Sequence, residues 1–387
     1  MAIQTFKRKF KMKINIIKKC QICNSKLYFF LDLGSQPLCD DLKNIPNKNK
    51  FYKTKILYCK SCLTAFQKYN VNKKKLFHKE YHYRAANTKD VVNGMKDLVN
   101  NVSKFKKLKN ARVLDIGCND GSLLDIFKKN GAITYGVEPT GAYKEAKKKG
   151  HYIYNKFFDL NFVKKLNQIA KKIDIITFTN VFAHIDDFKK LIYNLKEIIS
   201  TDTLLVIENH YLGEVLKKNQ FDTFYHEHPR TYSLNSFYKI SNILNMNIIY
   251  YRFVKRYNGN IQVFLGKTEN LKINKLLKSD LKKELKLRSK FNNFQYKIER
   301  WRSRKKKFLK NLVKKHGPLP AKAFPGRASI IINFLKLNKN YISKIYEKNN
   351  SLKINKFVPG TDIIILKEKL LKKKDNKKTI ILNLAWH

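Results

Sequence analysis

The chain has 387 residues, of which 82 are Lys or Arg and 29 are Asp or Glu, so its formal net charge is +53. Hydrophobic residues make up 43% of the sequence, which excludes a wholly disordered chain and suffices for two or three domain cores. No apolar run reaches the ~18–20 residues of a membrane-spanning helix, and the N-terminus lacks the pattern of a secretory signal. We therefore expect a cytoplasmic protein with no membrane partner.

The positive charge is mostly Lys, spread along the chain among many Ile and Asn residues. Nucleic-acid sites favour Arg, whose planar fork makes bidentate contacts. The distribution is typical of an AT-rich coding bias and argues against a nucleic-acid partner. The oligomeric state stays open, with a monomer among the options.

Four of the six cysteines form two short pairs, Cys20 with Cys23 and Cys59 with Cys62. A C-x2-C turn places two thiolates on one side of a tight knuckle, and two knuckles supply the four ligands of a tetrahedral Zn²⁺ site. Disulfides or a redox-active pair would not explain two matched pairs in a chain without a secretory signal. The pattern therefore predicts a structural zinc ion that takes no part in chemistry.

A short apolar strand that ends at Asp115 is followed by a turn containing Gly117, Asn119 and Gly121, and then by an expected helix. Glycine and asparagine tolerate the positive φ that lets a backbone approach a ligand closely. The turn lacks the G-x-G-x-x-G pattern of a dinucleotide site, because Asn119 occupies its second glycine position. Its Asp-x-Gly-x-x-x-Gly pattern fits S-adenosylmethionine better than a nicotinamide cofactor or a bare structural turn.

A second expected strand, 134–137, ends at Glu138 and Pro139. An acid at this place in a doubly wound sheet faces the ribose hydroxyls of a bound nucleoside. Apolar segments at 173–178 and 203–207 continue the sheet, and Asn180 follows the first of them. The predicted cofactor-binding residues are Asp115, Gly117, Asn119, Gly121, Glu138, Pro139 and Asn180.

Beyond about residue 250 the pattern changes. Residues 271–315 are highly charged, contain neither Gly nor Pro and are predicted to be helical, and a second strand-and-helix pattern follows. The predicted fold class is α/β. We expect a zinc-binding ribbon domain at 1–75, a Rossmann-like class I methyltransferase domain at 76–250, and a second, smaller Rossmann-like α/β domain at 251–387.

The segment Tyr225-His226-Glu227-His228 contains two of the nine histidines beside a tyrosine and a glutamate. Its histidines lack the i, i+4 spacing of a zinc protease, and Pro229 argues against a continuous helix. A polar surface loop is the simplest alternative. Histidine and tyrosine next to a methyl-donor site are better explained as acid–base groups.

Taken together, these motifs resemble the S-adenosylmethionine-dependent C-methyltransferases that modify nucleotide-linked keto-deoxysugars. The resemblance spans nearly the whole chain, and its shared order is more specific than any one motif. Besides the paired cysteines it rests on Leu33–Leu38, Tyr81–Tyr83, Asp115–Gly121, Asn180–His184, Tyr225–His228, Tyr257–Phe264, Pro325–Ser329, Val358–Thr361 and Leu384–Trp386.

The resemblance implies methyl transfer to carbon. A keto group makes the neighbouring carbon acidic, a histidine can remove its proton, and nearby donors can hold the enolate oxygen. By resemblance His228 is the general base, with His226 or Glu227 next in line. The catalytic residues implied are His228, Tyr225, Glu227, His226, His184 and Tyr83.

In the third domain, loop residues are the candidates for binding a nucleotide-linked substrate, because amides and cations there could meet a diphosphate. They are Lys322, Arg327, Pro359 and Gly360. The alternative is that these loops are plain turns. Two other functions stay open: a zinc-ribbon nucleic-acid methyltransferase, and a non-catalytic scaffold that keeps the cofactor fold.

Overall fold

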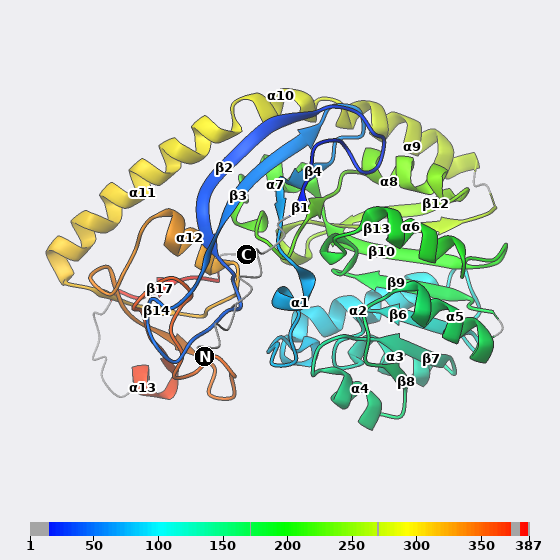
Figure 1. The fold of residues 1–387 in the computed structure, drawn as a ribbon, viewed down its shortest axis with the longest axis horizontal. Coiled ribbons are helices and arrows are strands. Elements are labelled where there is room, and N and C mark those ends of the chain that lie inside the picture. The colour runs from blue at the N-terminus through cyan, green and yellow to red at the C-terminus, as the bar shows by residue number, and fades with distance from the viewer. Residues whose placement is uncertain (1–14, 171, 269–270, 373–379, 386–387) are drawn as a thin grey trace, which may run out of the picture.

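The computed structural model describes residues 15–170, 172–268, 271–372 and 380–385. The largest sheet of the described residues has seven strands in the spatial order β12-β13-β10-β9-β6-β7-β8, on the right of Figure 1. The β13 strand runs antiparallel to both of its neighbours, and the remaining pairs are parallel. The strands are β6 (Arg112–Ile116), β7 (Ile133–Val137), β8 (Tyr152–Tyr154), β9 (Ile175–Thr179), β10 (Leu204–His210), β12 (Asn247–Val254) and β13 (Asn260–Gly266).

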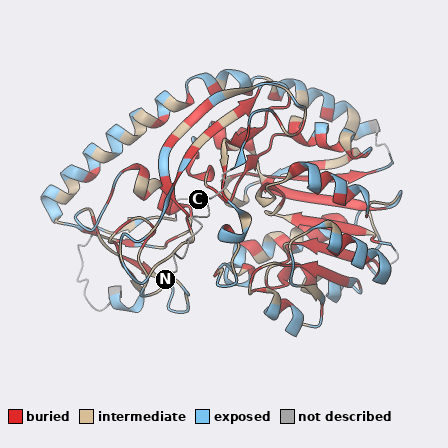
Figure 2. Cartoon of the chain, in the orientation of Figure 1, coloured by how far each residue is buried: buried red, intermediate tan, exposed pale blue. Residues whose placement is uncertain are grey.

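Helices cover both faces of this sheet, because successive strand residues point to opposite sides. Val113 packs against α2 (Lys89–Val102) and α3 (Ser122–Lys129), whereas Leu114 faces the opposite layer. That layer consists of α5 (Leu160–Ile169), α6 (Phe188–Lys196) and α8 (Leu234–Ile243). Figure 2 shows the strands buried between helices whose outer faces are exposed. The predicted parallel sheet with helical crossovers is confirmed.

The N-terminal ribbon is built on a long curved hairpin of β2 (Leu27–Pro37) and β3 (Phe51–Cys59). Its sheet has the order β11-β4-β3-β2, and β4 spans Ala65–Gln67. The edge strand β11 (Arg230–Thr231) lies in the sequence between β10 and β12 of the seven-stranded sheet, directly after the Tyr225–Pro229 segment. Two short strands, β1 (Asn15–Ile16) and β5 (Tyr69–Asn70), pair with each other in a separate sheet.

The charged stretch predicted as one helix forms three helices. They are α9 (Leu271–Glu284), α10 (Leu287–Asn292) and α11 (Phe294–His316), which run across the top of Figure 1. The break follows Glu284, whose carboxylate accepts hydrogen bonds from the backbone N–H groups of Leu234 (2.8 Å) and Asn235 (2.7 Å) at the start of α8. The break thus lies beside a tertiary contact with α8, which the local sequence does not reveal.

The C-terminal domain holds a parallel sheet in the order β16-β15-β14-β17, with α12 (Ala328–Phe334) against it. Its strands are β14 (Leu319–Lys322), β15 (Ile342–Glu347), β16 (Ile365–Lys367) and β17 (Leu382–Asn383), and the short helix α13 is Lys369–Lys372. The second, smaller α/β sheet is therefore present as predicted. The seven-stranded sheet, however, continues through Gly266, beyond the expected domain limit at residue 250.

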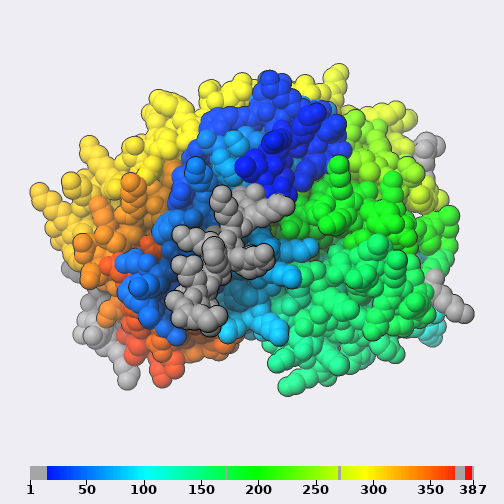
Figure 3. Space-filling model, viewed as in Figure 1, coloured from blue at the N-terminus to red at the C-terminus, as the bar shows by residue number. Residues whose placement is uncertain are grey.

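The ribbon lies between the two α/β domains. Figure 3 shows its surface in blue, between the orange C-terminal domain and the green methyltransferase domain. One hydrophobic cluster joins Phe30 of the hairpin to Phe291 of α10, Phe294 of α11 and Phe334 of α12. Within the described residues, no helix combines the length and the apolar character that crossing a membrane requires. The shorter helices are α1 (Lys73–Leu76), η1 (Ala85–Asn87), α4 (Tyr143–Lys148), η2 (Phe182–His184), α7 (Leu212–Lys217), η3 (Phe221–Thr223) and η4 (Arg256–Asn258).

Candidate active site

The four paired cysteines come together at the end of the β2–β3 hairpin. The Sγ atoms of Cys20, Cys23, Cys59 and Cys62 all lie within 4.8 Å of one another. All six cysteines of the chain are described, and none forms a disulfide. Four sulfurs at this spacing match the filled tetrahedron of a structural zinc ion, which leaves no open position for catalysis.

The charges of these thiols depend on one another. The pKa of Cys59 is lowered to about 2, chiefly because Cys20 donates a hydrogen bond to its sulfur, and the pKa of Cys20 is raised to about 12 by the same contact. Thr64 Oγ1 lies 3.1 Å from the sulfur of Cys62. Thiolates packed this closely repel one another, and a divalent cation removes that repulsion.

The glycine turn between β6 and α3 lets a ligand approach the backbone closely at the end of β6. Gly117 has φ +73°, and a Cβ atom there would lie 2.6 Å from Val181 Cγ2, so only glycine fits. Asn119 (φ 50°) donates its backbone N–H to Glu138 Oε2 over 3.0 Å. Glu138 Oε1 accepts a hydrogen bond from Thr140 N–H over 2.8 Å. Each carboxylate oxygen keeps a second acceptor site, so Glu138 can still accept hydrogen bonds from a ribose.

A second segment lies across this turn. The side chain of Asn119 accepts a hydrogen bond from Ala85 N–H (3.0 Å) and donates one to the Tyr83 carbonyl (3.1 Å). Asp120 accepts another from Ala86 N–H over 2.9 Å. The turn predicted to hold the cofactor therefore also fixes the position of Tyr83. This tyrosine is 40% exposed.

The other predicted cofactor residues lie around this turn at different depths. Asp115 is buried in β6, where it accepts a hydrogen bond from Thr177 Oγ1 (2.7 Å), and burial raises its pKa to about 7. Asn180 (φ 57°) ends β9 and accepts a hydrogen bond from Asn260 Nδ2 (3.0 Å). Pro139 is half-buried beside Glu138. Gly121 (φ +79°) precedes α3.

His228 stands at the centre of a cluster of aromatic rings. Its ring centroid lies 5.0 Å from that of His184, 5.4 Å from that of His210 and 4.2 Å from that of Tyr225. Its Nδ1 lies 2.9 Å from the carbonyl oxygen of Thr223. A carbonyl can only accept, so Nδ1 carries the hydrogen of the neutral ring and Nε2 is left as the basic nitrogen.

Burial lowers the pKa of His228 well below 6.5, and the neighbouring His184 and His210 lower it further. The pKa of His184 falls to about 4 for the same reason, burial. Both imidazoles are therefore neutral near pH 7. A neutral Nε2 on an oriented ring has the state that a general base requires.

Tyr225 and Glu227 belong to the same cluster. Tyr81 donates its hydroxyl hydrogen to Glu227 Oε2 over 3.2 Å. Burial, with the nearby Asp40, raises the pKa of Glu227 well above its ordinary value, which favours the protonated carboxyl group. Asp40 itself pairs with His82 Nε2 over 3.2 Å. The ribbon thus contributes an acidic residue that sequence reasoning missed.

His226 points away from this cluster. Its Nε2 lies 3.0 Å from Thr54 Oγ1 in the β3 strand, and its ring packs edge-on against Tyr52. Burial lowers its pKa to about 4. Of the two neighbouring histidines, His228 therefore lies among the other site residues, and His226 anchors the loop to the ribbon.

The four predicted substrate residues are spread over the C-terminal domain. Arg327 is buried and forms an ion pair with Asp222 over 3.1 Å, next to the His228 loop. Lys322 is exposed at the end of β14. Pro359 and Gly360 form a turn that hydrogen-bonds to Asn333 of α12 and to the ribbon. Of this set, the structure brings only Arg327 close to the catalytic candidates.

Two aromatic residues of the site were not among the predicted ones. His210 ends β10, and Tyr257 lies in the loop between β12 and β13, with their rings 5.5 Å apart. The hydroxyl of Tyr257 is 3.2 Å from that of Tyr83. The position of His210 at a strand end was a usable signal. Nothing in the local pattern around Tyr257 indicates which way its ring points.

Three family models match successive parts of the chain. A zinc binding domain matches residues 20–77, a methyltransferase domain matches residues 84–249, and a C-methyltransferase C-terminal domain matches residues 257–387. Among curated proteins, the C-methyltransferase NovU of Streptomyces niveus is 21% identical over 360 residues, covering 90% of this chain and 85% of its own. Ubiquinone biosynthesis O-methyltransferase of Coxiella burnetii is 29% identical over 96 residues, covering 24% of this chain and 40% of its own.

Two solved structures are also similar. The PH0226 protein of Pyrococcus horikoshii OT3 aligns with 48% of this chain and 95% of its own, at a TM-score of 0.38 and 13% identity. Magnesium protoporphyrin IX methyltransferase of Synechocystis PCC 6803 aligns with 46% of this chain and 83% of its own, at a TM-score of 0.36 and 17% identity.

The three family models, in this order, cover the ribbon, the seven-stranded sheet and the C-terminal sheet described above. Zinc is the metal of the four-cysteine cluster, and S-adenosylmethionine is the cofactor of the central domain. The chain belongs to the S-adenosylmethionine-dependent C-methyltransferases that carry an N-terminal zinc-binding domain.

Proposed function

We propose that this protein transfers a methyl group to the carbon next to the keto group of a nucleotide-linked keto-deoxysugar, through an enolate. The observation that carries the proposal is the fixed ring of His228. Its Nδ1 is committed to the Thr223 carbonyl, which leaves Nε2 as the basic nitrogen, and its ring packs against those of His184 and Tyr225. Carbon methylation requires such a base, because a carbon acid must lose a proton before it can act as a nucleophile.

In the proposed reaction, His228 Nε2 removes the proton from the carbon next to the carbonyl. Negative charge then develops on the carbonyl oxygen, where Tyr225 and the protonated Glu227 are available as donors. Bound S-adenosylmethionine supplies an electrophilic methyl group on its sulfonium. The Gly117 turn and Glu138 hold the cofactor, and His184 stacks on His228 and keeps water from the imidazolium that forms.

The nucleotide part of the substrate has a matching surface. A cavity of about 930 Å³ is lined by α11, by the end of α7 and by β17, and it reaches Asp222, the partner of Arg327. Arg300, Arg304 and Lys305 lie at this cavity together with Trp301. Guanidinium groups bind diphosphates bidentately and an indole stacks on a base, which supports a nucleoside diphosphate as the carrier.

The test is methyl transfer to a panel of nucleotide-linked 4-keto sugars, followed by mass spectrometry with labelled S-adenosylmethionine. The His228→Asn variant should bind both ligands but lose ~10²–10⁴-fold in rate. The His316→Asn variant, at an exposed position on α11, is the matched control and should keep wild-type activity.

Solvent-deuterium exchange at the acidic carbon, with S-adenosylhomocysteine in place of the methyl donor, should occur in wild type and vanish in His228→Asn. Exchange that persists in the variant would place the base elsewhere. Equal activity on the free sugar would contradict the nucleotide-linked substrate, and methyl transfer to oxygen or nitrogen would contradict the enolate.

A further inference from the structure

The loop between β12 and β13 holds a tyrosine in a backbone conformation that tyrosine rarely adopts. Tyr257 has φ 52° and ψ 28°, and Asn258 (φ 63°) and Gly259 (φ 135°) follow it. The left-handed region suits asparagine and glycine, whereas a bulky residue there is strained. Strain of this kind persists where the surroundings fix it, and it concentrates at ligand sites.

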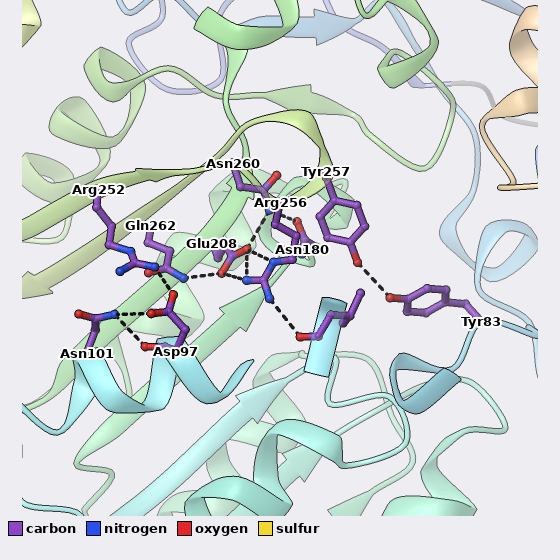
Figure 4. A network of polar contacts seen from close by, with 11 residues as sticks. Tyr83, Asp97, Asn101, Asn180, Glu208, Arg252, Arg256, Tyr257, Asn260 and Gln262 are labelled. Carbon is purple, nitrogen blue, oxygen red and sulfur yellow. Dashed lines mark hydrogen bonds and ion pairs between the residues drawn. The ribbon is translucent and has the colours of Figure 1, made fainter. Parts of the chain in front are cut away.

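A buried ion pair on the residue before Tyr257 fixes this loop (Figure 4). The Arg256 guanidinium contacts both carboxylate oxygens of Glu208, with Nε 3.1 Å from Oε1, and the Glu208 side chain is 0% exposed. Asn260 Nδ2 and Gln262 Nε2 also donate to Glu208, over 2.9 and 2.7 Å. The ends of the loop are thus tied to the same carboxylate in β10.

The same arginine ties the loop to α2. Its Nη1 donates to the carbonyl of Val91 over 3.1 Å. The guanidinium occupies the space beside Gly94, where any Cβ atom would overlap it. The loop is therefore held from β10, from β13 and from α2, and this restraint leaves the Tyr257 side chain little choice of direction.

The ring of Tyr257 is directed toward the site. Its hydroxyl lies 3.2 Å from the hydroxyl of Tyr83 (Figure 4). Its ring meets that of His210 edge-on, with the ring centroids 5.5 Å apart. His210 in turn packs against His228, and Tyr83 is tied to the cofactor turn through Asn119. Through these contacts the tyrosine pair is connected on one side to the rings around His228 and on the other to the cofactor turn.

The chemistry of the pair follows from counting hydrogens. Burial raises the pKa of Tyr257 well above 10, and the nearby Tyr83 raises it further, so both groups stay protonated. Two hydroxyls in contact share one hydrogen, because one donates to the other. The second hydrogen remains available to a ligand oxygen, and Tyr83 is 40% exposed, so a ligand can approach it.

We propose that Tyr257 is a further catalytic residue, which together with Tyr83 donates a hydrogen bond to the carbonyl oxygen of the methyl acceptor as its enolate forms. This inference rests on the proposed enolate reaction. The Glu208–Arg256 pair is the positioning element, which keeps Tyr257 in its strained conformation before any ligand binds. The tyrosine pair would supply a donor in addition to Tyr225 and Glu227.

The experiment measures hydrogen–deuterium exchange at the acidic carbon of the best nucleotide-linked 4-keto sugar, with S-adenosylhomocysteine bound. Removing one enolate donor costs ~10²–10³-fold in favourable sites, and we expect Tyr257→Phe to slow exchange at least tenfold. Affinity for S-adenosylhomocysteine, measured by calorimetry, should stay within about twofold. Tyr193→Phe, at a 53% exposed position on α6, is the matched control and should exchange at the wild-type rate.

The variants Tyr83→Phe and Tyr83→Phe/Tyr257→Phe complete a double-mutant cycle. The pair acts as a unit, so the double variant should be no more than about threefold slower than the slower single variant. Wild-type exchange in Tyr257→Phe would overturn the inference, and so would additive losses. Should Tyr257→Phe fail to fold, Tyr83→Phe decides by the same criterion. A wild-type protein that neither exchanges nor methylates any 4-keto sugar would overturn the proposed function itself.

Discussion

The strongest test of the architecture is to replace Arg256 by methionine. The substitution keeps most of the side-chain volume but leaves the carboxylate of Glu208, which is 0% exposed, without its cation. Removing one partner of a buried ion pair typically lowers the free energy of unfolding by ~3–5 kcal/mol. At ~2–4 °C per kcal/mol for a unit of this size, the Tm should fall by about 10 °C.

The assay is unfolding followed by circular dichroism, with heat for the Tm and with urea for the free energy of unfolding. Arg252→Met is the matched control, because Arg252 pairs with Asp97, whose side chain is 48% exposed, and such pairs contribute ~0–1 kcal/mol. Adding Glu208→Gln to Arg256→Met removes the unpaired charge and should restore ~2 kcal/mol or more. If Arg256→Met costs no more than Arg252→Met, the buried pair does not stabilise the loop as argued.

Four further predictions follow, one on the cofactor, one on the metal and two on pH. Glu138→Ala should weaken S-adenosylmethionine binding in calorimetry more than it lowers the Tm, and unchanged affinity would remove Glu138 from the site. Metal analysis of protein purified without chelator should give about one zinc per chain, and Cys59→Ser should lose it; a folded protein without metal would contradict the cluster. The lowered pKa of His228 should keep kcat/KM level from pH about 8 to about 6, whereas an ordinary histidine would lose activity near 6.5. The folded-state pKa of His226, about 4, lies below its unfolded value, so its contribution to stability is complete above pH 6.5 and is lost as the pH falls toward 4.

Much of the fold followed from local patterns. The paired cysteines and the glycine turn each lie within a few residues, so their spacing alone predicts their geometry. The contact of Glu284 with the start of α8, about 50 residues earlier in the sequence, could not be predicted from a local pattern, and neither could the helix break beside it. Likewise β13 joins the central sheet by pairing with β10, and β12 by pairing with β13, which is a property of the whole sheet.

The sequence predicted the residue types of the site better than the directions in which their side chains point. The Tyr225–His228 segment was recognisable from composition, but only the contacts with Thr54 and Thr223 distinguish the role of His226 from that of His228. Tyr257 was missed because its role depends on a tyrosine that precedes it by 174 residues. Such pairings are decided by tertiary packing and leave no local periodicity.

The position of β11 in the ribbon sheet limits how this chain can be recombined. Residues 230 and 231 pair with β4, Gln67 N–H donates to the Pro229 carbonyl over 2.9 Å, and His226 bonds to Thr54, so the loop that carries His228 is fastened to the zinc ribbon at three places. A chimera that took its ribbon from one parent and its central domain from another would split this interface, even with the junction at a natural linker. Exchange of substrate specificity between relatives should therefore keep the ribbon and the 224–233 segment from the same parent and vary the C-terminal domain.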